Sequence, residues 1–167
     1  MRVQALAAAV LLTVGGEANA QGPAAVTFFI ASDCPISNVY APEIVRICTA
    51  YQSRGISCRL AYEDAKLDAS SLRKHLIEYK LQGVQSTWDR DRTLADDAGV
   101  TITPTAVVRD VRGNVRYRGR IDNLYINIGR TRQQVTNHDL TDALDAVLAG
   151  RPVREAITEA LGCYIER

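Results

Sequence analysis

The stretch FFIASDCPISNVYAP, residues 28–42, places one cysteine between an apolar run and a segment with helical spacing. The apolar run covers residues 25–31 and is rich in residues that favour β-structure, as expected of a strand buried on both faces. Apolar residues then recur at helical spacing over residues 38–53. Cys34 therefore lies where a predicted strand meets a predicted helix, and the residue three positions later is Ser37 instead of a second cysteine.

Further elements alternate along the rest of the chain. Strands are predicted over residues 56–62, 104–110 and 114–120, and helices over residues 68–81, 93–98 and 137–150. The order strand, helix, strand, helix, short helix, strand, strand, helix is typical of an α/β domain. It predicts parallel strands joined by crossover helices, followed by a closing hairpin and a last helix.

Length and charge limit the possible functions. A chain of 167 residues is long enough for one domain with a substantial core, so no staple is needed for folding. The formal net charge is +1, and Lys and Arg are scattered among Asp and Glu without a basic run. The sequence therefore has no basic segment of the kind that binds nucleic acid or an anionic membrane. We expect no nucleic-acid partner and no cofactor.

The first twenty residues resemble an export signal. Arg2 precedes an apolar segment over residues 3–14, and Ala18-Asn19-Ala20 is the small-x-small pattern that a signal peptidase cleaves. The apolar segment is much shorter than the roughly twenty residues of a membrane-spanning helix. We therefore predict a signal peptide over residues 1–20 and a periplasmic or secreted domain over residues 21–167 without a membrane span.

Export changes the interpretation of the cysteines, which in an oxidising compartment are expected to pair. Cys34, Cys48, Cys58 and Cys163 allow three pairings, and no two of them have a C-x-x-C spacing. Only His75, expected on a solvated helix face, and His138, expected at a helix start, are available as histidine ligands. We therefore expect no metal site.

Two features of the chain resemble thioredoxins. Pro42 lies inside the first predicted helix, eight positions after Cys34, although an internal proline normally costs a helix a hydrogen bond. The segment resembles the C-x-x-C-x-x-x-A-P motif of thioredoxins, with Cys34 in the place of the nucleophile and Ser37 in the place of the second cysteine. Thr103-Pro104 resembles the cis-proline step that faces the active-site cysteine in that fold.

A wider resemblance covers roughly residues 26–165. The segments DCPISN, TP, RYRGRID and GC, in this order, resemble a group of secreted redoxin-domain proteins of the thioredoxin superfamily, which neighbours the peroxiredoxins (the alkyl hydroperoxide reductase–thiol antioxidant group). The resemblance implies an α/β thioredoxin-like fold, a central mixed sheet of about four strands flanked by helices. It also implies a thiol–disulfide oxidoreductase acting on protein or small-molecule thiols and disulfides.

This resemblance suggests roles for the four cysteines. Cys34 is the expected nucleophile, because a helix N-terminus favours a thiolate, although the neighbouring Asp33 opposes it. Cys163 is the candidate resolving thiol, on a C-terminal tail over residues 151–167 with little reason of its own to be ordered; it could instead be free or intermolecular. Cys48 and Cys58 are expected to form a structural disulfide, with two free buried thiols as the alternative.

Alternative functions stay open at this point. A peroxiredoxin-like peroxidase would normally have Thr or Ser where this chain has Ala31, and an arginine where it has Thr103. A copper carrier or a non-catalytic binding module on the same scaffold is a third class, but copper(I) needs soft ligands that are scarce here. Residues 118–136 form either a solvated loop or a loop that recognises a partner or substrate.

Overall fold

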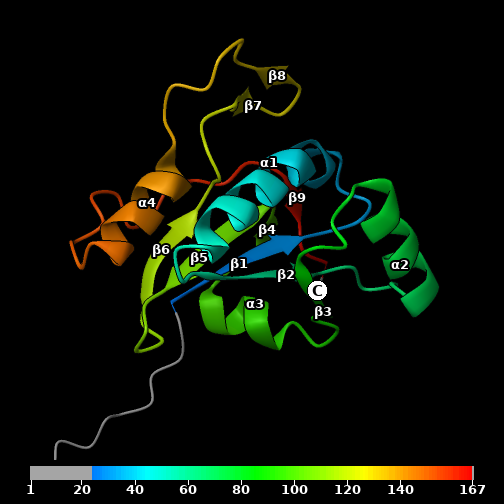
Figure 1. Cartoon of the computed structure of the whole chain (residues 1–167). Coiled ribbons are helices and arrows are strands. Elements are labelled where there is room, and N and C mark those ends of the chain that lie inside the picture. The colour runs from blue at the N-terminus through cyan, green and yellow to red at the C-terminus, as the bar shows by residue number, and fades with distance from the viewer. Residues whose placement is uncertain (1–23, 167) are drawn as a thin grey trace, which may run out of the picture.

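The computed structural model describes residues 24–166, so the predicted signal peptide lies outside the described residues. Its main sheet has five strands in the order β3-β2-β1-β5-β6 (Figure 1). These strands are β1 (Ala25–Ile30), β2 (Ser57–Tyr62), β3 (Gln85–Trp88), β5 (Thr105–Arg109) and β6 (Val115–Gly119). β1, β2 and β3 run parallel, whereas β5 is antiparallel to both β1 and β6. The mixed α/β architecture predicted from the sequence is confirmed.

The main sheet has five strands, whereas the sequence predicts about four, because the sequence gives no clear signal for β3. Its sequence, QSTW, is short and has one apolar residue, and its residues are exposed or only partly buried at the sheet edge. An edge strand of this kind has neither the apolar run nor the clear alternation that identifies a strand in a sequence.

Helices cover both faces of the sheet. They are α1 (Pro35–Gln52), α2 (Ala69–Glu78), α3 (Thr93–Ala98) and α4 (Asp139–Leu148). Core residues of α1 and α4 share one apolar cluster with one face of the sheet, and Leu72 and Leu76 of α2 pack at its margin. Ala95 and Ala98 of α3 belong to a second, smaller cluster on the other face. The domain is thus a sheet between two helical layers.

Strand β1 shows why the sheet is buried on both sides. Its side chains alternate: Val26, Phe28 and Ile30 pack into the larger cluster, whereas Phe29 packs into the smaller one. Because the central strand has apolar side chains on both faces, it reads in the sequence as one continuous apolar run.

Residues 118–136, which the sequence left open, contain a small hairpin. Strands β7 (Tyr125–Asn127) and β8 (Arg130–Thr131) pair with each other and project from the body of the domain (Figure 1). The base of the projection is anchored, because the Arg120 guanidinium binds the Asp139 carboxylate at 2.8 and 3.1 Å. Tyr40 of α1 donates a 2.7 Å hydrogen bond to Asp122.

The C-terminal segment is docked along the domain, a placement for which the sequence offered little reason. Strand β9 (Cys163–Tyr164) pairs antiparallel with β4 (Ile102–Thr103). Further upstream, the backbone at Arg118 exchanges hydrogen bonds with Ala156 and Thr158 at 2.9 and 3.1 Å. The C-terminal segment therefore lies against β6 and against β4, the strand that directly precedes Pro104.

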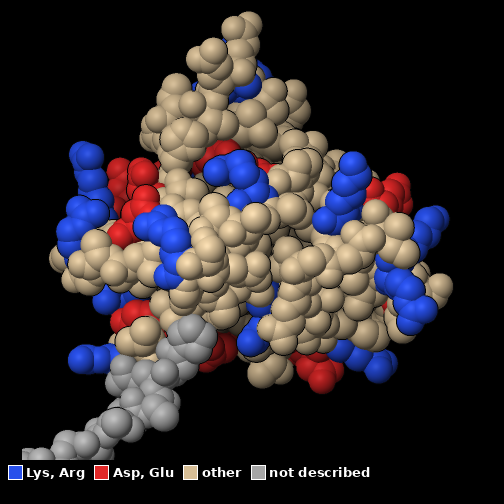
Figure 2. Space-filling view, viewed as in Figure 1, with Lys and Arg blue, Asp and Glu red and all other residues tan. Residues whose placement is uncertain are grey.

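Charges on the face seen in Figure 2 are mixed, with Lys and Arg interspersed among Asp and Glu and no extended basic patch. No helix within residues 24–166 has the length and apolar character needed to cross a membrane.

Candidate functional site

Cys34 lies at the N-terminus of α1, as the sequence predicted. It occupies the N-cap position with extended backbone angles (φ −84°, ψ 110°), and Pro35 opens the helix, where its missing N–H leaves no hydrogen bond unmade. The Cys34 carbonyl accepts the first helical hydrogen bond, from Asn38, at 3.1 Å. The sulfur is therefore held beside the unpaired N–H groups that begin the helix.

The two prolines that suggested the fold are also where the sequence placed them. Pro42 lies inside α1. The Thr103–Pro104 peptide bond is cis, as predicted. It lies beside the cysteine, because the Cys34 sulfur is 3.4 Å from the Thr103 carbonyl oxygen. Cys34 and Thr103, 69 residues apart in the chain, thus belong to one site.

The β4–β9 pairing brings the second sulfur to this site. Thr103 and Cys163 are partners in the antiparallel register, and the Cys163 side chain lies close enough to Cys34 to lower the pKa of its thiol. Gly162 makes the approach possible, since a Cβ at this position would overlap the Thr103 carbonyl oxygen. The two cysteines that the sequence proposed as a redox couple are therefore in contact.

The surroundings of Cys34 set the pKa of its thiol. Burial alone would raise this pKa, because it disfavours the thiolate. Hydrogen bonds from the Cys163 thiol, from the Ser37 backbone and hydroxyl and from the Thr103 side chain outweigh burial and lower the pKa below the usual thiol range. The Thr103 carbonyl acts in the opposite sense, since it accepts a bond from the protonated thiol. The sum favours the thiolate, which is the nucleophilic form.

Cys163 has the opposite electrostatic character. Burial and the neighbouring Cys34 sulfur, with a smaller effect of Asp33, raise the pKa of Cys163 to about 12. The two thiols are therefore shifted in opposite directions: their surroundings favour the charged form at Cys34 and disfavour it at Cys163.

Ser37 completes the immediate surroundings of Cys34. It is buried, its hydroxyl accepts a 3.4 Å hydrogen bond from the Ala31 backbone, and it contributes to the lowered pKa of Cys34. A hydroxyl thus occupies the position of the second cysteine in a C-x-x-C motif and contacts the thiolate without being able to form a disulfide.

The other two cysteines lie elsewhere. Cys48, on α1, and Cys58, on β2, are both buried in the larger core cluster as free thiols in hydrogen-bond contact with each other. That hydrogen bond, with burial, raises the pKa of Cys48 far above the usual thiol range. Their contact agrees with the predicted pairing, and the disulfide itself stays a prediction.

His75 does not lie on a solvated face, so that expectation is wrong. The side chain is buried, with Nδ1 2.8 Å from the Tyr62 hydroxyl and Nε2 2.9 Å from the Asn38 side-chain oxygen. Burial lowers its pKa. His138 is at the start of α4, as expected. Within residues 24–166, no three His, Cys, Asp or Glu side chains are grouped so that they would hold a metal ion.

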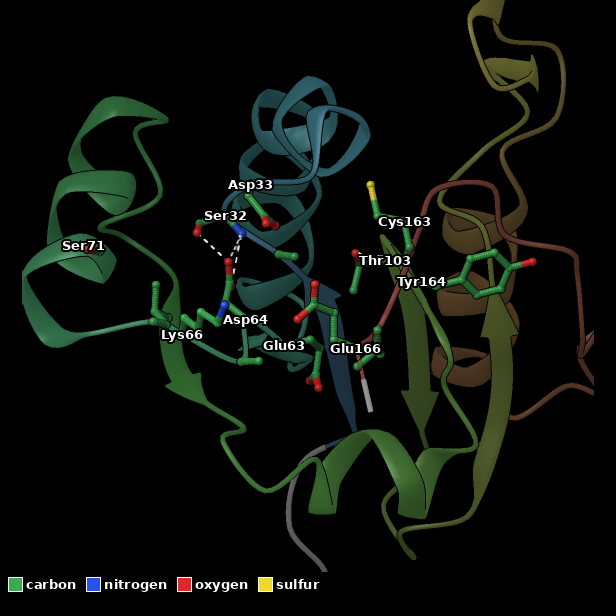
Figure 3. A pocket seen from close by; sticks show the side chains of 14 residues that line it. Ser32, Asp33, Glu63, Asp64, Lys66, Ser71, Thr103, Cys163, Tyr164 and Glu166 are labelled. Atoms are coloured by element: carbon green, nitrogen blue, oxygen red, sulfur yellow. Dashed lines mark hydrogen bonds between the residues drawn. The ribbon is translucent and has the colours of Figure 1, made fainter.

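A cavity of 520 Å³ opens beside Cys163 (Figure 3). Cys34 is fully buried and does not line it. Asp33 and Asp64 lie on one side of it, and Thr103, Cys163 and Tyr164 lie on the other. The Asp64 carboxylate fixes the loop after β1, since it accepts hydrogen bonds from the Ser32 backbone and hydroxyl, the first at 2.9 Å. The cavity lies at the carboxyl ends of β1 and β2, where open α/β sheets usually bind ligands.

Glu63 is a cavity residue that the sequence gave no reason to single out. Its side chain is 6 % exposed, and neither carboxylate oxygen has a hydrogen-bond partner among the described residues. Burial, together with the Asp89 and Asp64 carboxylates, raises the pKa of Glu63 to about 8. A glutamate directly after a predicted strand is normally solvated, so only its position immediately after an apolar run hinted at burial.

Comparison with known proteins identifies the architecture. No family model and no curated protein matches the chain. An uncharacterised conserved protein of Geobacillus kaustophilus superposes with a TM-score of 0.75 and 26 % identity over 89 % of this chain and 79 % of its own. A secreted Mycobacterium tuberculosis disulfide oxidoreductase, homologous to E. coli DsbE, superposes with a TM-score of 0.54 and 18 % identity over 76 % of this chain and 84 % of its own. The chain has a thioredoxin-like fold.

A third solved structure has the same overall fold as this chain. A hypothetical protein of Sinorhizobium meliloti has a TM-score of 0.70 and 24 % identity over 87 % of this chain and 80 % of its own. Within the thioredoxin-like fold of the present chain, the start of α1 and the cis-proline step meet at Cys34, as the sequence resemblance implied.

Proposed function

We propose that this protein is a thiol–disulfide oxidoreductase in which Cys34 is the nucleophile and Cys163 is the resolving thiol. The observation that carries the proposal is the juxtaposition of the two cysteines beside Pro104, with the pKa of Cys34 lowered and that of Cys163 raised. A lowered pKa provides the thiolate that attacks a substrate disulfide. The neighbouring thiol is then in reach to release the mixed disulfide.

Each residue at the site has a role in this proposal. Ser37 and Thr103 stabilise the Cys34 thiolate through hydrogen bonds, and Pro104 shapes the strand that faces it. The β4–β9 pairing keeps Cys163 at the site, so resolution within the chain does not depend on an external thiol. Cys48 and Cys58 lie in the core and take no part in exchange.

We further propose that the protein acts after export, with the signal peptide over residues 1–20 removed. The sequence pattern of those residues supports this, and the similar M. tuberculosis oxidoreductase is a secreted protein. The mass of the mature N-terminus tests the proposal. A chain that begins at Gln21 is expected, and an intact Met1 in exported material would contradict it.

Exchange is tested with a disulfide substrate and the purified, reduced protein. The Cys163→Ser variant is expected to attack the substrate and then accumulate as a mixed disulfide on Cys34, visible as an added mass, because the in-chain resolving thiol is missing. The unmodified protein is expected to pass through this state to an internal disulfide. Equal turnover of the two proteins would exclude the resolving role of Cys163.

A further inference from the structure

The Cys34 sulfur is closed off from solvent in the structure. The Cys34 side chain is 0 % exposed, although the proposed exchange requires its sulfur to meet a sulfur from outside. Cys163, by contrast, is partly exposed and lines the open cavity, while lying close enough to Cys34 to change its pKa. The C-terminal segment therefore lies between the cavity and the nucleophile.

Gly162 closes the approach along the cis-proline step. An added Cβ at this position would meet the Thr103 carbonyl oxygen and the Pro104 ring, so the Gly162 backbone lies directly against both. The Thr103 carbonyl oxygen is itself 3.4 Å from the Cys34 sulfur. A substrate disulfide must therefore displace residues 162–163 to reach that sulfur from the side of β4.

The upstream end of the C-terminal segment is firmly attached to β6. The Thr158 hydroxyl shares a 2.7 Å hydrogen bond with the hydroxyl of the buried Tyr117 and accepts a 3.1 Å bond from the Arg120 backbone N–H. The Thr158 N–H donates to the Arg118 carbonyl at 3.1 Å. Thr158 is thus a fixed point about which the following residues can swing.

The residues that cover Cys34 are held less firmly. β9 has two residues, and beyond it the Ile165 N–H donates a 3.0 Å hydrogen bond to the Thr101 carbonyl. The Ile165 side chain packs at the margin of the smaller core cluster, whereas the Tyr164 side chain is 80 % exposed. Segments with few buried apolar contacts and exposed residues are the ones that detach locally while the rest of a protein stays folded.

We propose that residues 159–166 form a hinged cover, which is closed over Cys34 in the reduced protein and must detach from β4 before Cys34 reacts. This inference rests on the proposed exchange function and describes the regulation of that site. Opening exposes the Cys34 thiolate to a substrate disulfide, and docking of β9 returns Cys163 for the resolving step. One movement therefore controls substrate access and resolution, and the closed state shields the thiolate from other reagents.

The two chemical steps fall on either side of the closing movement. With the cover open, the Cys34 thiolate attacks one substrate sulfur, the substrate disulfide breaks, and the first substrate thiolate leaves and takes up a proton. After closure, Cys163 gives up its proton and attacks the Cys34 sulfur, which forms the Cys34–Cys163 disulfide and releases the second substrate thiol. The protein dithiol is oxidised by two electrons as the substrate disulfide is reduced to two thiols.

Alkylation of Cys34 tests the cover without relying on exchange. Reduced protein is treated with iodoacetamide or with the much larger iodoacetamidofluorescein, and mass spectrometry follows the Cys34 peptide. The plateau rate at high pH, where the thiol is ionised, reports access separately from the pKa. Relative to the chain unfolded in urea, we expect the plateau rate to be at least about tenfold lower for both reagents, and by the same factor, because the cover must open for either.

Paired variants identify the segment that covers Cys34. Ile165→Ser removes packing that holds the cover, and should raise the plateau rate of Cys34 by about tenfold, as expected when a partly buried isoleucine is lost. Tyr164→Ser, at the adjacent exposed position, is the matched control and should change the rate less than about twofold. Circular dichroism checks that both variants are folded. If Ile165→Ser is unfolded, the comparison of the two reagents on the unmodified protein decides the question.

The outcomes separate the cover from the exchange function. A plateau rate close to that of the unfolded chain, protection that grows with reagent size, or equal plateau rates in folded Ile165→Ser and Tyr164→Ser would each overturn the cover. The exchange function fails in a different way: Cys34 is protected and then released by Ile165→Ser, yet a substrate disulfide oxidises neither protein. That result would remove the exchange function, while the protection measured by alkylation would stand.

Discussion

The four cysteines form two pairs of touching thiols with opposite electrostatic properties. Burial acts to raise the pKa at both Cys34 and Cys48, and each hydrogen-bonds a second thiol. The pKa of Cys34 is nevertheless lowered, whereas that of Cys48 is raised. The difference is that Cys34 lies at a helix N-terminus and receives additional bonds from Ser37 and Thr103. Contact between two thiols is therefore not enough to activate either.

Position in the fold explains why the two pairs diverge. Cys48 and Cys58 lie inside the larger apolar cluster, between α1 and β2. Cys34 lies where α1, the cis-proline step and β9 meet, and its partner lines an open cavity. One pair is suited to holding the core together, the other to reacting with molecules from outside.

The largest expected effect comes from removing the thiolate. Cys34→Ser should reduce thiol–disulfide exchange to the level of the uncatalysed reaction, because the variant lacks the one cysteine at a helix N-terminus whose surroundings lower the thiol pKa. The measurement is the rate of substrate disulfide reduction, with circular dichroism to check folding. Cys58→Ser, a change in the other pair, is the control and should retain activity. Comparable activity in folded Cys34→Ser would erase the distinction between the pairs.

The next effect concerns the strand that carries Cys163. Gly162→Ala places a methyl group against the Thr103 carbonyl, so β9 must move away although both cysteines are retained. Formation of the internal Cys34–Cys163 disulfide should slow by at least about tenfold, because the local concentration of the resolving thiol falls. Gly83→Ala, where an added Cβ meets nothing, is the matched control. Unchanged closure in Gly162→Ala would show that the β4–β9 pairing does not position the couple.

A smaller effect is expected on the reactivity of Cys34 itself. Cys163→Ala removes a hydrogen bond that favours the thiolate, and so raises the pKa of Cys34. Since only the thiolate reacts, alkylation by iodoacetamide should slow by about tenfold at pH 7, a loss that fades as the pH rises above the new pKa. Cys163→Ser keeps a donor and should slow less. A rate at pH 7 that does not distinguish the two variants would contradict the proposed effect of Cys163 on the pKa of Cys34.

The smallest effect on activity is expected from the core pair. Cys48→Ala should lower the free energy of unfolding by about 1–2 kcal/mol in reducing buffer, through lost packing. In oxidising buffer the difference from the unmodified protein should grow by about 2–3 kcal/mol, the contribution expected of the predicted disulfide. Denaturant unfolding in both buffers measures this. An equal loss of stability in the two buffers would show that Cys48 and Cys58 stay as thiols. A large loss of exchange activity in Cys48→Ala would contradict a purely structural role for this pair.

Features that depend on local sequence were the predictable ones. Pro42 within a helical pattern and Thr103-Pro104 before an apolar strand each carry a conformational restriction that the residues themselves impose. The order of elements, with the resemblance of these two segments to thioredoxins, predicts the fold, the place of Cys34 and the cis bond. The crossover helices followed from apolar spacing, with ends displaced by a few residues.

What the sequence did not reveal depends on contacts between distant segments. The two-residue pairing of β9 with β4 joins residues 60 apart, and nothing in either segment alone specifies it. His75 lies on a helix whose polar sequence predicts exposure, yet Tyr62 and Asn38 occupy both ring nitrogens. Burial of Glu63 follows from the elements packed around the end of β2, of which a single sequence gives no direct sign.

The partner of Cys34 in the oxidised protein tests the central claim most directly. Reduced protein is oxidised with one equivalent of disulfide, free thiols are blocked at low pH, and peptides are mapped by mass spectrometry without reduction. The contact between the two sulfurs predicts a Cys34–Cys163 linkage as the first disulfide formed, and one that a dithiol reverses. A first disulfide between Cys34 and any other cysteine, or Cys34 left free while Cys163 pairs elsewhere, would contradict the account.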